Sequence, residues 1–179
     1  MKFIPTQLAG ATLITPERRE DARGWFARVY CEREFEAHGL PTRMVQTNLS
    51  LTRRAGTLRG MHWQHAPHAE DKLVRCARGA IWDCIVDLRP TSPTYRQWFG
   101  AELSEDNGHM LLVPKGFAHG FVSLSDDAAV TYQVSAFYTP EAEGGARYDD
   151  PAFGIRWPVG VLDMSDKDRN WPAYVPEAQ

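Results

Sequence analysis

The chain has 179 residues and a formal net charge of −3, which fits one ordinary domain with a sizeable core. The charge is nearly balanced and no long basic run occurs, so nucleic acid is not expected as a partner. No segment is long and apolar enough to cross a bilayer, and residues 1–5 lack the apolar run of a signal peptide, so no membrane association is expected. Three cysteines without CxxC spacing suggest reduced thiols and a cytoplasmic location.

Short segments divided by turn residues predict an all-β fold. Twelve prolines and fourteen glycines punctuate the chain. One helix is expected over 31–38, with Gly39 as its stop. Turns are expected at 21–24 and 53–56. Strands are expected at 12–15, 25–30, 44–51, 58–64, 72–88 with a turn near Arg78 and Gly79, 95–103, 109–113, 114–122 and 128–138.

About nine short strands and one short helix predict a single domain over residues 1–179, built as a sandwich or barrel of two packed sheets. A jelly-roll barrel of this kind can hold a ligand in its mouth. The tail from Asp149 has little periodicity. We expect it to be an ordered wrap, because Trp157 and Trp171 need a surface to pack against.

Several polar and charged side chains occur within or beside predicted strands that are otherwise rich in apolar residues. The stretch 59–72 places three histidines, two acids, an arginine and a lysine between two strands. His62, Lys72, His119 and Tyr132 come from four separate segments. Such groups are costly to bury unless they are paired or used. They can converge only if their strands surround a common cavity.

Strand parity assigns several of these residues to an apolar face. Lys72 alternates with apolar neighbours in its strand, and Asp83 lies between Ile81 and Ile85 on one parity. Alternation over 128–138 places Tyr132 on the apolar face that Tyr138 shares, and Tyr132 is therefore expected to point inward.

One hypothesis is proton-transfer catalysis. A histidine can take a proton from carbon near neutral pH, a tyrosine can donate one from the other side, and a lysine can stabilise an oxyanion. His62, Tyr132 and Lys72 would suit removal of a proton next to a ketone. Taken alone, each also fits a structural role, as a core histidine, a core tyrosine or an edge-strand lysine.

A second hypothesis is a metal-binding barrel, such as a mononuclear iron or manganese oxygenase. The spacing disfavours it, because no His-x-His pair occurs and His62 and His65 have opposite parity. Its candidate ligands are His62, His65, His68, Glu70 and His119.

A third hypothesis is a binding module without chemistry that holds a phosphorylated ligand. Arginine suits phosphate because its planar fork binds two oxygens at once. The candidate residues are Arg23, Arg28, Arg59 and Lys72.

Together these segments resemble the dTDP-4-dehydrorhamnose 3,5-epimerase family of the cupin superfamily. The matching stretches run in family order across nearly the whole chain, and their combination is highly specific. They are residues 21–26 (DARGWF), 46–50 (QTNLS), 58–64 (LRGMHWQ), 72–76 (KLVRC), 83–89 (DCIVDLR), 92–95 (SPTY), 114–121 (PKGFAHGF), 130–132 (VTY), 149–151 (DDP), 155–158 (IRWP) and 165–168 (SDKD).

The resemblance implies a jelly-roll (cupin) barrel of two packed antiparallel sheets with a few short helices, usually a homodimer with strands exchanged between subunits. It implies epimerisation of a nucleotide-linked 4-keto-6-deoxy sugar, most often dTDP-linked, without a metal or redox cofactor. The product would feed deoxysugar synthesis for a surface polysaccharide or a glycosylated metabolite.

The resemblance also assigns roles. His62 matches the base, Asp168 the acid that orients it, Tyr132 the opposite proton donor, and Lys72 the group that stabilises the enolate. Tyr138 matches an aromatic that stacks on the nucleotide base. The other matching substrate contacts are Arg23, Gln46, Asn48, Arg59, His119, Glu143 and Lys167.

Two positions depart from the family pattern. Arg28 stands where glutamate is common, and Glu70 stands where glutamine is frequent. We include Arg28 among the expected substrate contacts, where it would reverse the charge. Simple alternation puts Arg59 opposite His62, and Gly60 is the expected site of a bulge that corrects this. Related members invert only C3 or only C5 with nearly the same residues, so single and double epimerisation both stay open.

Overall fold

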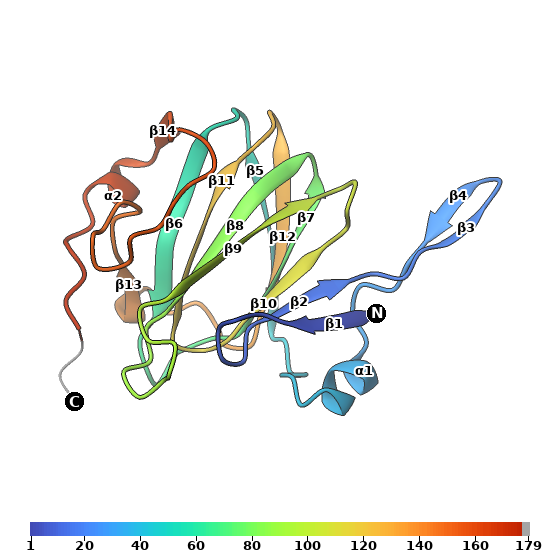
Figure 1. Ribbon diagram of the computed structural model, residues 1–179, viewed down its shortest axis with the longest axis horizontal. Coiled ribbons are helices and arrows are strands. Elements are labelled where there is room, and N and C mark those ends of the chain that lie inside the picture. The colour runs from blue at the N-terminus through green and yellow to red at the C-terminus, as the bar shows by residue number, and fades with distance from the viewer. Residues whose placement is uncertain (177–179) are drawn as a thin grey trace.

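The computed structural model describes residues 1–176 and consists mainly of two β-sheets packed face to face (Figure 1). The first sheet has the order β1-β2-β10-β7-β12-β5, and the second the order β13-β6-β11-β8-β9, with β14 parallel to β6 at its edge. All other pairings are antiparallel among the described residues. The predicted all-β jelly-roll barrel of two antiparallel sheets is confirmed.

The strands are short, as the spacing of glycine and proline predicts. The first sheet contains β1 (Lys2–Pro5), β2 (Thr12–Thr15), β5 (Gln46–Thr52), β7 (Lys72–Arg78), β10 (Met110–Val113) and β12 (Ala128–Val134). The second contains β6 (Thr57–Gln64), β8 (Ala80–Asp87), β9 (Trp98–Ser104), β11 (Phe117–Ser123), β13 (Glu143–Gly145) and β14 (Asp163–Met164). The remaining elements are β3 (Arg19–Asp21), β4 (Gly24–Phe26), α1 (Glu32–Ala37), α2 (Asp166–Arg169) and the 3₁₀ turn η1 (Pro140–Ala142).

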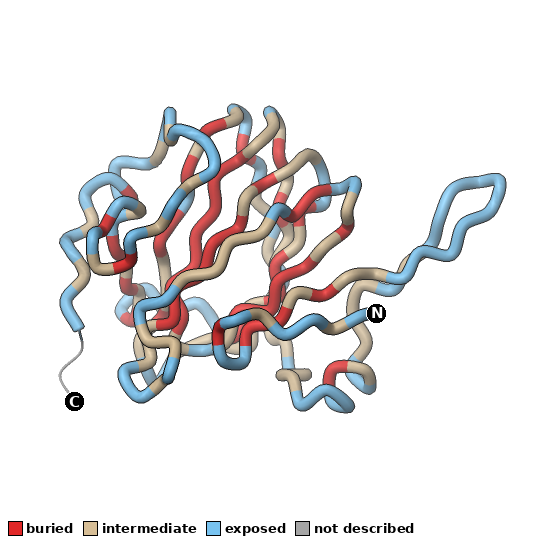
Figure 2. The backbone as a smooth tube through the Cα atoms, in the orientation of Figure 1, coloured by how far each residue is buried: buried red, intermediate tan, exposed pale blue. Residues whose placement is uncertain are grey.

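The main core lies between the two sheets and follows strand alternation. Figure 2 shows buried residues along the facing strands of both sheets. Apolar side chains from each sheet interdigitate there, and water is excluded from both inner faces. The buried members of this core are Leu8, Ala11, Val74, Cys76, Ile81, Ile85, Leu103, Leu111, Val113, Phe117, Phe121, Ala128 and Val130.

The outer face of each sheet is covered by a different segment. Helix α1 places Phe35 on the first sheet, against Ile14 and Met110. The C-terminal tail covers the second sheet, where the ring centroid of Trp157 lies 5.3 Å from that of Trp82. The tail is therefore an ordered wrap, as the tryptophans indicated. Within residues 1–176 no helix has the length and apolar character required to span a membrane.

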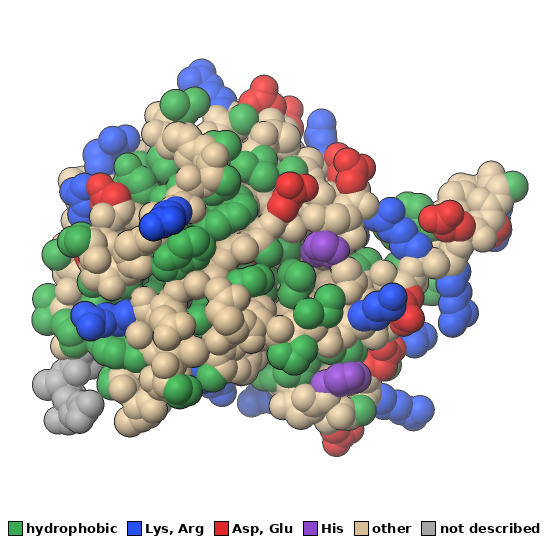
Figure 3. All heavy atoms as spheres, in the orientation of Figure 1, with side chains coloured by type: hydrophobic (Ala, Val, Ile, Leu, Met, Phe, Trp, Pro, Cys, Tyr) green, Lys and Arg blue, Asp and Glu red, His purple; other side chains and the backbone are tan. Residues whose placement is uncertain are grey.

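The β3–β4 hairpin extends away from the barrel as an arm (Figures 1 and 3). The predicted turn at 21–24 is present. The predicted strand over 25–30 is wrong in length, because β4 ends at Phe26. Its partner β3 offers only three residues for pairing, so no ladder exists beyond that point.

Two other predicted boundaries shift. The strand predicted over 128–138 ends at Val134, because its neighbours β5 and β7 supply pairing residues only as far as Gln46 and Lys72. The strand predicted over 95–103 begins at Trp98. Strand β1 was not predicted from the sequence.

Candidate active site

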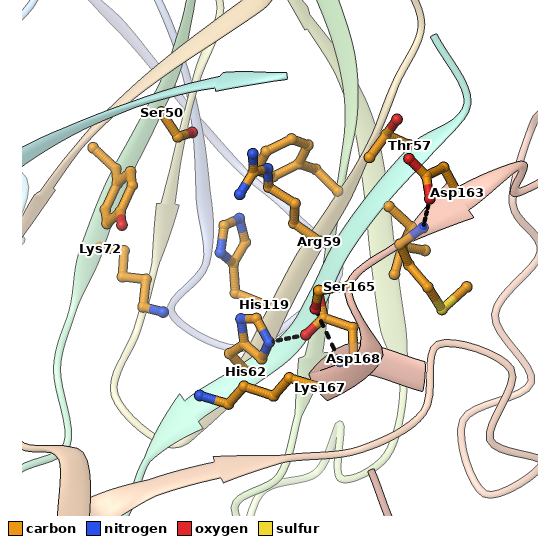
Figure 4. Close-up of a pocket in the computed structure, with 14 residues that line it drawn as sticks. Ser50, Thr57, Arg59, His62, Lys72, His119, Asp163, Ser165, Lys167 and Asp168 are labelled. Atoms are coloured by element: carbon orange, nitrogen blue, oxygen red, sulfur yellow. Dashed lines mark hydrogen bonds and ion pairs between the residues drawn. The ribbon is translucent and has the colours of Figure 1, made fainter. Parts of the chain in front are cut away.

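Four side chains from four strands meet in one cavity at the mouth of the barrel. His62 comes from β6, Lys72 from β7, His119 from β11 and Tyr132 from β12, and all four border a cavity of about 480 Å³. Figure 4 labels His62, Lys72 and His119 around this cavity. Strand parity explains this, because His119 alternates with the buried Phe117 and Phe121. The structure thus brings together the residues that the sequence placed in separate segments.

A bulge in β6 brings Arg59 to the same side as His62. His119 pairs with His62 and Phe121 pairs with Arg59, so two residues of β6 stand opposite one residue of β11. Gly60 lies in the bulge with φ +122°, a conformation that favours glycine. A Cβ atom at Gly60 would lie 2.5 Å from the Cα of Gly120. The expected bulge is therefore present, and Arg59 borders the cavity.

Asp168 holds the imidazole of His62. His62 Nε2 lies 2.6 Å from Asp168 Oδ1, and the dashed line in Figure 4 marks this contact. Asp168 lies in α2, whose N-cap residue Ser165 accepts a hydrogen bond from the Asp168 backbone N–H. Asp168 Oδ2 accepts a hydrogen bond from Gly60 N–H at 3.4 Å. Burial disfavours the carboxylate, but hydrogen bonds from His62 and its other neighbours outweigh burial and lower the pKa of Asp168. An ionised Asp168 accepts the Nε2 proton, which leaves the Nδ1 lone pair of His62 as the proton acceptor.

Tyr132 is kept in its protonated form. Burial raises the pKa of the phenol, the charge of Glu70 raises it further, and Arg59 acts in the opposite direction. Tyr132 pairs with Asn48 on one side and with Val74 on the other, so its position is fixed by the middle of the sheet. A neutral phenol in this place is able to donate a proton.

A second lobe of about 400 Å³ adjoins the first and shares His62, Lys72 and Tyr132 with it. The remaining residues that line it are Gln46, Asn48, Trp63, Gln64, Glu70, Val134, Tyr138 and Glu143. Most of these groups are hydrogen-bond donors or acceptors. The combined cavity is therefore polar and extended, as a ligand with several oxygen atoms requires.

Glu143 links two residues at the rim. Its Oε2 lies 2.6 Å from Lys167 Nζ and accepts from the Tyr138 hydroxyl at 3.1 Å. Burial acts against ionisation, but Lys167 and Tyr138 outweigh it and lower the pKa of Glu143. Tyr138 lies beyond the end of β12 and is 58% exposed. It borders the second lobe from the rim.

Two expected contact residues lie away from this cavity within a single chain. Arg23 is at the tip of the β3–β4 arm, where its side chain is 90% exposed and pairs with Asp21 at 2.6 Å. Arg28 pairs with Glu34 at 3.3 Å and borders a separate small cavity. The arm that carries Arg23 points away from the barrel, which accounts for the separation (Figure 1).

Two acids that the sequence analysis did not assign to proton transfer or substrate binding lie beside residues of the cavity. Asp83 Oδ1 lies 2.7 Å from His119 Nε2, and its Oδ2 is buried without a hydrogen-bond partner. Glu70 pairs with Lys72 at 3.3 Å. Parity had marked Asp83 as an acid among buried neighbours, but its partner comes from another strand and leaves no local signal.

The ligands that a metal-binding barrel requires are not assembled. His65 and His68 do not border either lobe. Within residues 1–176, no three His, Cys, Asp or Glu side chains are grouped so that they could hold a metal ion. His65 lies beyond the end of β6 at Gln64, so it does not share the strand face of His62.

A β-barrel with an oriented imidazole, a phenol and an ammonium in one polar cavity has the groups that an isomerase acting by proton transfer requires. A family model described as dTDP-4-dehydrorhamnose 3,5-epimerase matches residues 5–175. The chain belongs to this family. A relative of that name from Sinorhizobium fredii is 45% identical over 174 residues, which cover 97% of this chain and 89% of the relative.

Solved structures agree with this family. A dTDP-4-dehydrorhamnose 3,5-epimerase from Bacillus anthracis with TDP and PPi bound has a TM-score of 0.93 and 43% identity, covering 97% of this chain and 99% of that chain. An epimerase from Legionella pneumophila in complex with dTDP-4-keto-L-rhamnose has a TM-score of 0.90 and 37% identity, covering 96% and 92%. The resemblance found in the sequence is confirmed.

Proposed function

We propose that this protein inverts C3 and C5 of dTDP-4-dehydro-6-deoxy-D-glucose or a close relative. Membership of the epimerase family supports the reaction class. The observation that carries the proposal is the meeting of His62, Tyr132 and Lys72 in one cavity. These are the three groups that proton removal, proton return and oxyanion stabilisation require.

The reaction follows from the ketone at C4, which acidifies the C–H bonds at C3 and C5. His62 Nδ1 takes a proton from one face, and the electron pair of that bond moves to O4 to form an enolate. Lys72 stabilises the negative charge on O4. Tyr132 donates its proton to the same carbon from the other face, so the centre is inverted. The excess proton on His62 and the deficit on Tyr132 are balanced by exchange with water before the next centre reacts.

Each remaining residue has a place in this scheme. Asp168 keeps His62 in the tautomer with a free Nδ1. We expect Arg59, His119 and Lys167 to contact anionic or carbonyl oxygens, because they bring cationic or N–H groups to the first lobe. We expect Gln46, Asn48, Tyr138 and Glu143 to contact the substrate in the second lobe. The chemistry consists of proton transfers alone, so no metal or redox cofactor is part of the proposal.

We further propose a homodimer in which the β3–β4 arm reaches a second copy. Phe26 on the arm is 65% exposed, and Leu49 on the outer face of β5 is 73% exposed. Large apolar side chains in these positions are typical of contact surfaces. The arm would carry Arg23 toward the cavity of the other subunit, and Arg28 follows it in the chain.

A cytoplasmic location is part of the proposal. All three cysteines are free thiols, and Cys76 and Cys84 are buried. Free thiols are the usual state in a reducing compartment. Sugar nucleotides for polysaccharide or metabolite glycosylation would be processed there.

Incubation with dTDP-4-dehydro-6-deoxy-D-glucose in heavy water tests the reaction. Deuterium at both C3 and C5, followed by NMR, is the expected result. Deuterium at one position would identify a single-centre epimerase. No exchange at either carbon by a folded protein that binds dTDP would contradict the proposal. His62→Ala should lose exchange by about 10³-fold, whereas a pure binding module would lose no function.

A further inference from the structure

Arg59 is a cation of the first lobe whose charge no carboxylate neutralises. The lysine and arginine side chains that border this lobe are Arg59, Lys72 and Lys167 (Figure 4). Lys72 pairs with Glu70 at 3.3 Å, and Lys167 pairs with Glu143 at 2.6 Å. No carboxylate of residues 1–176 forms an ion pair with Arg59. Its charge is therefore available to an anionic ligand.

Two neutral acceptors on β5 hold the guanidinium of Arg59. Its Nε donates to the Thr52 hydroxyl oxygen at 3.1 Å, and its Nη2 donates to the Leu51 carbonyl at 3.1 Å. Both acceptors are uncharged, so they fix the direction of the planar guanidinium without cancelling its charge. A carboxylate in the same place would compete with an anionic ligand for the cation.

Thr52 is a firm anchor for this contact. It is 2% exposed, and as the last residue of β5 it pairs with Ala128 of β12. Arg59 belongs to β6 in the other sheet, so the hydrogen bond joins the two sheets. Thr52 itself borders neither lobe of the cavity. Any effect of its hydroxyl on a ligand must therefore pass through Arg59.

We propose that Thr52 is a positioning residue that aims the Arg59 guanidinium at the anionic part of the substrate. The inference rests on the proposed epimerase function, because the diphosphate is the only anionic part of a dTDP-linked keto sugar at neutral pH. The two contacts with β5 leave the other N–H donors of the guanidinium for phosphate oxygens. Without the hydroxyl, the long side chain would regain rotamer freedom, and ligand binding would have to order it again.

The test compares Thr52→Val, which removes the hydroxyl at nearly constant volume, with Thr52→Ser, which keeps it. Calorimetry measures dTDP binding, and thermal unfolding shows whether each variant is folded. Thr52→Val should weaken dTDP binding about tenfold and raise KM to a similar extent, with kcat within about threefold of wild type. Thr52→Ser should keep dTDP affinity and KM within about twofold of wild type. The matched control is Thr12→Val, a buried threonine on β2 that borders neither lobe, and it should change none of these quantities.

A double-mutant cycle shows whether Thr52 acts through Arg59. In the Arg59→Met background, Thr52→Val should change dTDP affinity by less than about twofold. An equal loss of affinity in both backgrounds, or wild-type affinity in a folded Thr52→Val protein, would overturn the inference. If Thr52→Val does not fold, Thr52→Ala replaces it in the cycle with the same expected outcomes. The affinities are measured without turnover. A wild-type protein that binds dTDP but exchanges no deuterium would therefore contradict the epimerase proposal, while the cycle would still decide the role of Thr52.

Discussion

His62 and His119 are direct partners across the β6–β11 pairing, and each ring presents its Nε2 to a separate buried aspartate. The distances are 2.6 Å to Asp168 and 2.7 Å to Asp83. Both imidazoles are therefore fixed in orientation, and each keeps Nδ1 for other contacts. The two aspartates differ in the hydrogen bonding of their second carboxylate oxygen. Asp168 Oδ2 accepts a hydrogen bond from Gly60 N–H, whereas Asp83 Oδ2 is buried without a hydrogen-bond partner.

The Asp168 carboxylate should be essential to the His62 base. In Asp168→Asn, an amide replaces the anion that selects the Nε2–H tautomer, and kcat should fall by about 10³-fold with the fold retained. Because the pKa of Asp168 lies below its usual value, the wild-type pair should persist down to about pH 4. Steady-state kinetics measures the loss. Asp166→Asn, an exposed position on the same helix, is the control and should stay within twofold of wild type.

Replacement of Tyr132 by phenylalanine should separate proton removal from inversion. In Tyr132→Phe, His62 can still take a proton and return a deuteron to the same face, so deuterium exchange should continue within about tenfold of wild type. Inverted product should fall by about 10²-fold or more, because the opposite donor is missing. NMR of the sugar in heavy water measures both quantities. Inversion at the wild-type rate would show that Tyr132 is not the donor.

The sequence predicted the convergence of these groups better than it predicted the strand ends. Lys72, His119 and Tyr132 carry a local signal, since each alternates with residues of the buried type. The end of β12 at Val134 has no such signal, because it depends on where β5 and β7 supply pairing residues. Tyr138 lies beyond this end, so the alternation of β12 does not reach it.

Contacts between segments that are distant in the chain also could not be predicted from the sequence. Asp83 and His119 are separated by 36 residues, and they meet because β8 and β11 are neighbours in the sheet. Arg23 lies in the β3–β4 hairpin, which forms a separate two-stranded sheet among residues 1–176. The bulge at Gly60 was predictable, since a glycine within a strand is a local feature.

Gly60 should tolerate no side chain. In Gly60→Ala, the new Cβ would meet Gly120 Cα at 2.5 Å and the His119 carbonyl oxygen at 2.8 Å, and φ is +122°. We expect a loss of about 3 kcal/mol in the free energy of unfolding, from overpacking and left-handed strain together. Urea denaturation measures this loss. In the control Gly160→Ala, the added Cβ has no non-neighbouring atom within 4 Å. Its free energy of unfolding should stay within about 0.5 kcal/mol of the wild-type value. Equal stabilities of the two variants would contradict the steric argument.

Asp87 should make stability depend on acid pH. Burial disfavours this carboxylate, but hydrogen bonds from Arg89, Ser92 and Thr94 outweigh burial and lower its pKa. Asp87→Asn should cost about 3 kcal/mol at pH 7, because it leaves Arg89 without its anion. A carboxyl whose pKa is lower in the folded state stabilises the fold at pH values above the ordinary aspartate pKa. This stabilisation is lost as the pH falls through the lowered pKa. The difference between wild type and Asp87→Asn in thermal unfolding should therefore shrink below about pH 4. A difference that is constant from pH 7 to pH 3 would contradict the linkage.

The proposed homodimer can be tested at its surface and at its active sites. Leu49→Glu places a charge on the exposed outer face of β5 and should shift the protein from dimer to monomer in sedimentation. Val159→Glu, on the C-terminal segment, is the control.

If the arm serves the other subunit, a mixture of Arg23→Met and His62→Asn chains, each inactive alone, should regain about a quarter of wild-type activity. Half of the random dimers are mixed, and each contains one site with both residues intact. A mixture that stays inactive after subunit exchange would place Arg23 outside the site of the second copy.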